Sequence, residues 1–116
     1  MIEDNCIFCR IVKKYEPAKI IFQDIKITAF WDTHPIAPVH ILLIPNEHIP
    51  SINELKEEDA FIVAKLITHA RMLAQEFDIA DRGFRLVINT GIEGGQTINH
   101  LHLHLIGGRK FSPVLK

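Results

Sequence analysis

Residues 100–108 have the sequence HLHLHLIGG, in which three histidines alternate with three leucines before two glycines. Successive side chains of a β-strand point to opposite faces, so the alternation predicts a strand over residues 100–106. We expect His100, His102 and His104 on one face and the leucines on the other, packed against a helix. Same-face neighbours lie about 6.6–6.8 Å apart. Adjacent imidazoles could therefore share a ligand atom or a substrate phosphate.

A glycine-rich loop over residues 90–99, TGIEGGQTIN, precedes this strand. Glycine lets the backbone approach a ligand closely, and successive N–H groups can bind an anion. Three interpretations of the histidines stay open. They are polar residues on a solvated face, ligands of a catalytic metal, or a neutral imidazole nucleophile with its helpers. A phosphate bound at the loop would face the histidines, which favours phosphoryl chemistry.

The rest of the chain predicts an α+β domain that spans residues 1–116. Apolar and β-branched runs indicate a short helix over 6–13, a hairpin of strands 19–23 and 26–31 around Asp24, a loop over 32–39, and strands over 40–45 and 84–89. The strand over 40–45 is almost entirely apolar, so we expect both of its faces to be buried.

A long helix is predicted between the strands at 40–45 and 84–89. Ser51 and Glu54 have the spacing of a capping box, and the acidic run 57–59 suits the positive end of a helix. Residues 81–83, Asp-Arg-Gly, are expected to end it. Apolar residues recur every three or four positions and predict the core-facing stripe: Val63, Leu66, Ile67, Ala70, Leu73, Ala74 and Phe77.

Composition excludes several classes of protein. The 116 residues are 47% hydrophobic and 23% charged, which predicts a packed core rather than disorder. The formal net charge of −1 gives no basic footprint for nucleic acid or a membrane surface, and we expect neither partner. Glu3 and Asp4 argue against a signal peptide. Cys6 and Cys9 are too close for a disulfide framework, so we expect a cytoplasmic protein.

The sequence resembles the histidine triad superfamily of nucleotide hydrolases and transferases, whose motif is His-φ-His-φ-His-φ-φ with φ apolar. The similarity runs from about Cys6 to Arg109. Five segments are similar to the nucleoside phosphoramidase branch, the histidine triad nucleotide-binding proteins: AKIIFQD, APVHILLIPNEHI, GFRLVINTG, GGQT and HLHLHLIGGR. The resemblance implies a five-stranded antiparallel sheet with one long helix and a short N-terminal helix. Two protomers would join into a ten-stranded sheet.

The resemblance also implies an activity. A homodimer would hydrolyse purine nucleoside 5′-phosphoramidates, such as AMP linked to an amine, through a covalent nucleotidyl-histidine on His102. His40 would orient His102, while His104 and Thr97 would contact phosphate oxygens or the leaving amine. The nucleotide-binding set would be Ile7, Phe8, Ile11 and Phe30 at the base, Asp32 at the ribose, and Asn89, Gly95, Gln96, Thr97, His102 and His104 at the phosphate.

Two other functions stay open. One is a dinucleoside polyphosphate hydrolase or nucleotidyltransferase that uses the same histidine. The other is a nucleotide-binding scaffold without catalysis, against which an intact nucleophile argues. None of the three requires a cofactor for its chemistry.

The Cys6-x-x-Cys9 pair supplies half of a tetrahedral zinc site. Related triad proteins that keep this pair hold zinc, and the resemblance implies a structural zinc at Cys6, Cys9, His48 and His100. Two free thiols packed as small apolar residues are the alternative. A redox pair lacks the βαβ context that a thioredoxin-like site requires.

Overall fold

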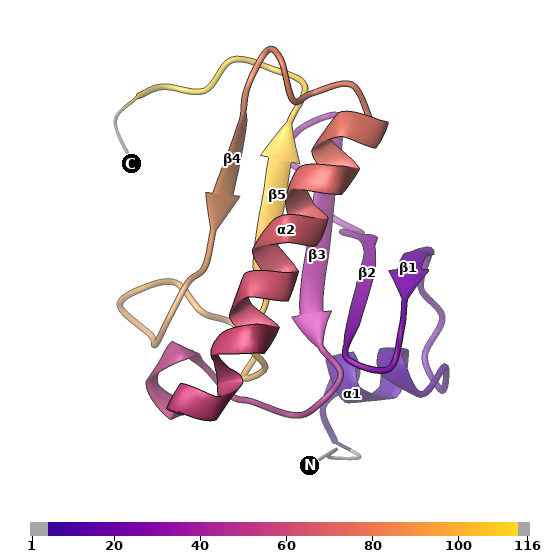
Figure 1. Cartoon of the computed structure of the whole chain (residues 1–116), viewed down its shortest axis with the longest axis vertical. Helices are drawn as coiled ribbons and strands as arrows, with labels where there is room; N and C mark the ends of the chain where they lie inside the picture. The colour runs from indigo at the N-terminus through magenta and orange to yellow at the C-terminus, as the bar shows by residue number, and fades with distance from the viewer. Residues whose placement is uncertain (1–4, 114–116) are drawn as a thin grey trace.

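The computed structural model describes residues 5–113, so Glu3 and Asp4 lie outside it. Its strands form an antiparallel sheet in the order β1-β2-β3-β5-β4. The strands are β1 (Ile20–Gln23), β2 (Ile27–Trp31), β3 (Val39–Pro45), β4 (Phe84–Val87) and β5 (Leu103–Gly107). The long helix α2 (Ala60–Glu76) and the short helix α1 (Ile7–Val12) complete the predicted α+β fold (Figure 1). Within the described part of the chain, α2 and α1 both lack the length and apolarity to cross a bilayer.

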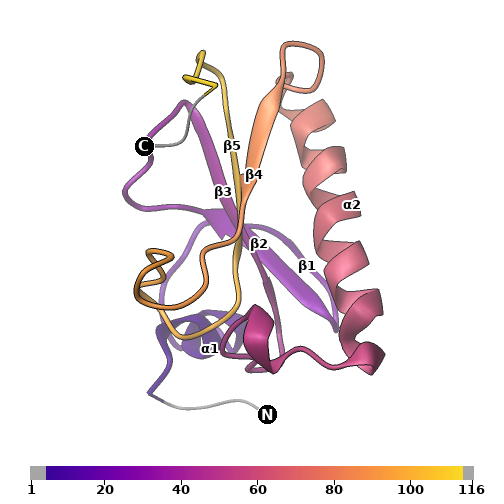
Figure 2. The ribbon, with the colours of Figure 1, turned by 90° about the vertical axis from the view of Figure 1, so that its left-hand side faces the viewer.

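The two faces of the sheet are covered differently. Viewed edge-on in Figure 2, α2 lies along one face, while α1, the glycine-rich loop and the loop after β2 lie on the other. All of β3 is buried, as its apolar sequence predicts, because it lies in the middle of the sheet between β2 and β5. We call the face opposite α2 the histidine face, because it carries His104 and His40.

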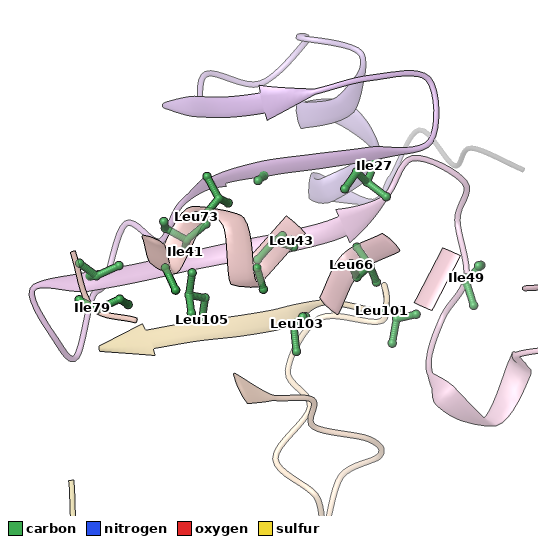
Figure 3. Close-up of a cluster of buried hydrophobic side chains, with 14 residues drawn as sticks. Ile27, Ile41, Leu43, Ile49, Leu66, Leu73, Ile79, Leu101, Leu103 and Leu105 are labelled. Carbon is green, nitrogen blue, oxygen red and sulfur yellow. The ribbon is translucent and has the colours of Figure 1, made fainter. Parts of the chain in front are cut away.

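The leucines of the opening motif form the core beneath α2, as the alternation predicts. Leu101, Leu103 and Leu105 are at most 2% exposed and join one cluster with the α2 residues Leu66, Ala70, Leu73 and Ala74 (Figure 3). The α2 residues recur at helical spacing and so lie on one side of the helix. Ile67 was predicted for that stripe, but it is 44% exposed because it lies beside the buried face.

The predicted ends of the long helix are wrong. Ser51 caps only a single 3₁₀ turn, Ile52–Glu54, where its Oγ accepts from Asn53 N (3.1 Å) and donates to Glu54 Oε1 (2.6 Å). A second 3₁₀ turn leads into α2 at Ala60. The helix then ends at Glu76, ahead of residues 81–83, because Asp78 takes a left-handed conformation (φ 60°) that stops it.

The final strand is also shorter than predicted, because β5 begins at Leu103 rather than at residue 100. The preceding backbone bonds to nearby loops instead of a strand: His100 N donates to Ile98 O (2.8 Å) and Leu101 N to Ile49 O (2.7 Å). The chain still places Leu101 in the core under α2. His100 and His102 therefore reach the histidine face from a bend that leads into β5.

Candidate active site and metal-ligand cluster

Strand register brings the histidines together on the histidine face. His104 of β5 lies opposite Leu42 of β3, and His40 of β3 lies opposite Ile106 of β5. Directly opposed residues share a face, so His40 and His104 are diagonal neighbours. The His102 ring is 5.0 Å from the His104 ring between centroids, and His102 is buried. Residues far apart in the chain thus form one group of three imidazoles.

His102 is held in a single tautomer. Its Nδ1 is 2.7 Å from the main-chain oxygen of His100, and a carbonyl oxygen only accepts hydrogen bonds. Nδ1 therefore carries the proton, and Nε2 keeps its lone pair when the ring is neutral. The acceptor is a backbone group, which the histidine pattern alone does not reveal.

His40 contacts His104 rather than orienting His102 directly. Ile36 N donates to His40 Nδ1 (3.2 Å), so the proton of neutral His40 resides on Nε2. That Nε2 lies 2.9 Å from His104 Nδ1 and 3.3 Å from Asp32 Oδ2. His104 Nδ1 must then accept, which leaves its own proton on Nε2. A chain of bonds beginning at the Ile36 amide therefore makes His104 Nε2 a hydrogen-bond donor.

Both imidazoles of this pair are neutral near pH 7. Burial lowers the pKa of His104 to about 4, with further lowering by the neighbouring His102 and His40 against an opposing effect of Asp32. Burial also lowers the pKa of His40, and the Asp32 carboxylate opposes it. At neutral pH this pair therefore presents an N–H donor at His104 Nε2.

The glycine-rich loop satisfies many of its own polar groups. The Gly95 N–H, expected to bind phosphate, donates to Ile92 O (3.1 Å). Gln96 donates through Nε2 to Pro50 O (2.7 Å) and accepts at Oε1 from Gly91 N (3.0 Å). Asn89 Nδ2 donates to Gly94 O (2.8 Å). In this conformation these groups shape the loop, while Thr97 is exposed on it.

The expected base-binding residues are largely packed together. Phe8, Ile11 and Phe30 are 4–5% exposed and form a second apolar cluster with Leu42 and Ile44 of β3. Ile7 is 40% exposed and is the accessible member of the expected set. Asp32, expected at the ribose, accepts from His34 N through Oδ1 (2.7 Å) and approaches His40 through Oδ2.

Cys6, Cys9, His48 and His100 come together from three separate segments, with all four ligand atoms within 4.8 Å of one another. Three sulfur-to-nitrogen distances are 3.3 Å (Cys6–His100), 3.3 Å (Cys9–His48) and 3.6 Å (Cys9–His100). A tetrahedral zinc with ordinary Zn–S and Zn–N bonds separates such atoms by about 3.6 Å. His100 Nε2 donates to Pro45 O (2.9 Å), which leaves Nδ1 unprotonated and able to bind a metal. This cluster fits a metal ion.

Asp32, His40 and His104 form a second group of close ligand atoms. In this group Nδ1 of His40 accepts from the Ile36 N–H, whereas the second nitrogen of His100 donates to the Pro45 carbonyl. A metal on His40 Nε2 would force a proton onto Nδ1, where two donors would then meet. This second group fits a hydrogen-bond relay rather than a metal site.

Compared with known protein families, residues 13–111 of this chain match the HIT (histidine triad) domain. The chain belongs to the HIT-domain family. The purine nucleoside phosphoramidase of Escherichia coli K12 is 42% identical over 112 residues, which cover 97% of this chain and 94% of that protein.

Two solved HIT-family structures match this chain over nearly their whole length. A HIT family hydrolase from Clostridium thermocellum is 40% identical, with a TM-score of 0.95 over 98% of this chain and 99% of its own. A HIT family hydrolase from Legionella pneumophila is 42% identical, with a TM-score of 0.92 over 94% of this chain and 97% of its own.

Sequence reasoning missed the backbone groups that set the HIT site's tautomers. These are the Ile36 N–H, the His100 carbonyl and the Pro45 carbonyl. Every residue has such groups, so no side-chain pattern could have identified them. Phe8 was expected only as a contact of the nucleotide base. Its ring contacts with His100 and His102 were also missed.

Proposed function

We propose that this chain hydrolyses purine nucleoside 5′-phosphoramidates, with AMP as the nucleotide product. The observation that carries the proposal is the complementary pair of tautomers: a lone pair at His102 Nε2 beside an N–H donor at His104 Nε2. Nucleophilic attack on phosphorus needs the lone pair of His102. The N–H of His104 can stabilise the negative charge that grows on a phosphoryl oxygen. The E. coli relative, named purine nucleoside phosphoramidase, supports the choice of substrate.

The proposed reaction has two displacements at phosphorus. His102 Nε2 attacks phosphorus, the bond to the amine nitrogen breaks, and the amine leaves with its electron pair and takes a proton from solvent. Water then attacks phosphorus and gives a proton to solvent, the bond to His102 breaks with its electron pair returning to Nε2, and AMP is released. The Nδ1 bond to the His100 carbonyl stabilises the His102 ring while it carries the nucleotidyl group. His104 donates to a phosphoryl oxygen in both steps.

The remaining contacts follow the family pattern. Ile7, with the Phe8, Ile11 and Phe30 cluster beneath it, would receive the base, and Asp32 the ribose hydroxyls. The exposed Thr97 hydroxyl would reach the leaving amine or a phosphate oxygen. The phosphate would be contacted by Asn89, Gly95 and Gln96. Each of these donors now makes a hydrogen bond to a protein carbonyl, so the loop must exchange some of these bonds for bonds to the ligand.

We further propose that the Cys6–Cys9–His48–His100 cluster holds a structural zinc ion. Zinc bound to four protein ligands has no open position for substrate, so its contribution is to hold the ligands together. Purified protein should contain about one ion per chain, and Cys6→Ser/Cys9→Ser should lose it. Protein purified without metal and still folded and active would contradict a zinc requirement.

A homodimer is proposed from the exposed edge of the sheet. β4 is an edge strand, and Leu86 on it is 36% exposed on the α2 side, because it lies opposite the buried Leu105 of β5. On the same side of the sheet, an apolar hollow of about 200 Å³ has Ile67, Ile88 and Leu103 among its lining residues. Pairing β4 with its copy would extend the sheet to ten strands and cover this surface. Sedimentation analysis of wild type and Leu86→Glu tests it, and a monomeric wild type would contradict it.

The test of the activity compares two substrates and two variants. Wild type should turn over an adenosine phosphoramidate faster than a diadenosine polyphosphate, and His102→Gln should lose turnover while still binding AMP. His69→Gln is the matched control, because His69 lies on α2 away from the histidine face. Faster cleavage of the diadenosine compound would favour the second candidate, and full activity of His102→Gln would contradict the mechanism.

A further inference from the structure

His100 belongs to both the metal-ligand cluster and the active site. Its Nδ1 lies 3.3 Å from Cys6 Sγ and 3.6 Å from Cys9 Sγ, and the residue is fully buried. Its main-chain carbonyl accepts the Nδ1–H of His102 at 2.7 Å. The group that fixes the tautomer of the nucleophile is thus part of the residue that the cluster holds. Because the ring is held both at the cysteines and at Pro45 O, the cluster restricts where the His100 carbonyl can lie.

Phe8 provides a second connection between the cluster and the nucleophile. It lies on α1 between Cys6 and Cys9, and its ring meets the rings of His100 (5.7 Å between centroids) and His102 (5.2 Å) edge to face. Cys6 also caps α1, accepting from Cys9 N at 3.4 Å. The same two cysteines therefore position the helix that presses Phe8 against the nucleophile.

We propose that the Cys6–Cys9–His48–His100 cluster is a positioning device for the nucleophile, acting through the His100 carbonyl and the Phe8 ring. The proposal rests on the proposed function for its kinetic consequence. With the cluster intact, His102 stays in the Nδ1–H form and presents its Nε2 lone pair. When the cluster is disrupted, both constraints on the His102 ring loosen. In part of the population the ring proton then moves from Nδ1 to Nε2, and that tautomer cannot attack.

The competing explanation is that the cluster only stabilises the fold. A purely stabilising cluster would leave His102 in the same tautomer in whatever fraction stays folded. The proposal predicts a change in His102 within folded protein. The discriminating measurement must therefore report on the His102 ring itself, and nitrogen chemical shifts of labelled histidine distinguish Nδ1–H from Nε2–H. His102→Gln identifies the signal by removing it.

The experiment compares zinc-loaded wild type, chelator-treated wild type, and zinc-loaded Phe8→Leu with Phe77→Leu as the matched control. Phe77 packs beside Trp31 under α2, on the opposite face from His102. Chelated wild type and Phe8→Leu should show mixed His102 tautomers and a kcat lowered about 10- to 100-fold, which is the usual effect of losing a supporting shell. Phe77→Leu should lose stability but keep the wild-type tautomer and kcat. Adding zinc back to the chelated sample should restore the single His102 tautomer and the wild-type kcat.

Several results would overturn the proposal. One is a single unchanged His102 tautomer in folded, zinc-free protein. Another is an unchanged tautomer in Phe8→Leu, which tests the Phe8 connection even if zinc-free protein unfolds. A wild type that cleaves no phosphoramidate would contradict the proposed function instead, and the tautomer measurement would still decide whether the cluster positions His102.

Discussion

The neutral state of His104 makes a prediction about acid stability. Because burial lowers the pKa of His104 from 6.5 to about 4, the unfolded chain binds more protons than the folded protein between these values. Stability therefore falls as the pH falls through this window. For one group with these two pKa values, linkage gives a loss of roughly 2 kcal/mol between pH 7 and pH 5. His104→Gln removes the titrating group and with it this part of the pH dependence.

The assay is urea unfolding of wild type and His104→Gln at both pH values. Other titrating groups are present in both proteins, so the difference between their pH dependences isolates His104. Ile106→Val is the control. Ile106 is buried two residues further along β5, so its loss of a methylene should cost about 1 kcal/mol at either pH. If His104→Gln loses as much stability as wild type between pH 7 and pH 5, His104 is not held neutral by its surroundings.

Two further predictions concern the fold. Burial tends to raise the pKa of Asp24. The ion pair with Lys65 and the hydrogen bonds that the carboxylate accepts from backbone amides outweigh this effect and lower the pKa to about 2. Asp24→Asn should therefore cost about 1 kcal/mol at pH 7, after discounting for solvent screening, and this difference should vanish as the pH falls from about 4 to 2. An equal cost at pH 2 would exclude the ionic origin. A Cβ on Gly107 would lie 2.6 Å from Ile79 Cδ1, so Gly107→Ala should cost about 1–3 kcal/mol in thermal or urea unfolding. Adding Ile79→Val, which removes that atom, should recover most of the loss, and no recovery would rule out this clash.

The alternation in the opening motif was sufficient to predict which side chains enter the core. Leu101, Leu103 and Leu105 are buried under α2 as expected, because period-two patterning needs only a locally extended chain. The limits of elements were less predictable. Ser51 and Glu54 make the same local hydrogen bonds whether a 3₁₀ turn or an α-helix follows. Asp78 ends α2 by adopting a left-handed conformation, for which the sequence carries no strong signal.

In the active site, too, the side chains involved were predictable from the sequence, and the backbone hydrogen bonds were not. The alternating histidines and the glycine-rich loop favoured phosphoryl chemistry, and the family resemblance added His40. The structure brings the rings of His40, His102 and His104 together. Which nitrogen of each ring carries a proton depends on the Ile36 amide and the His100 carbonyl, whose positions only the folded chain reveals. The residue pattern therefore predicted the participants but could not predict the direction of each hydrogen bond.

The most direct test of the central claim is to look for the covalent intermediate. Wild type mixed with an adenosine phosphoramidate, quenched within one turnover and digested, should yield a peptide heavier by one adenylyl group, with that group on His102. His104→Gln should give the same modified peptide more slowly, and His102→Gln none. Rapid turnover with no adenylyl peptide at any quench time, or adenylyl attached to a different residue, would contradict the account.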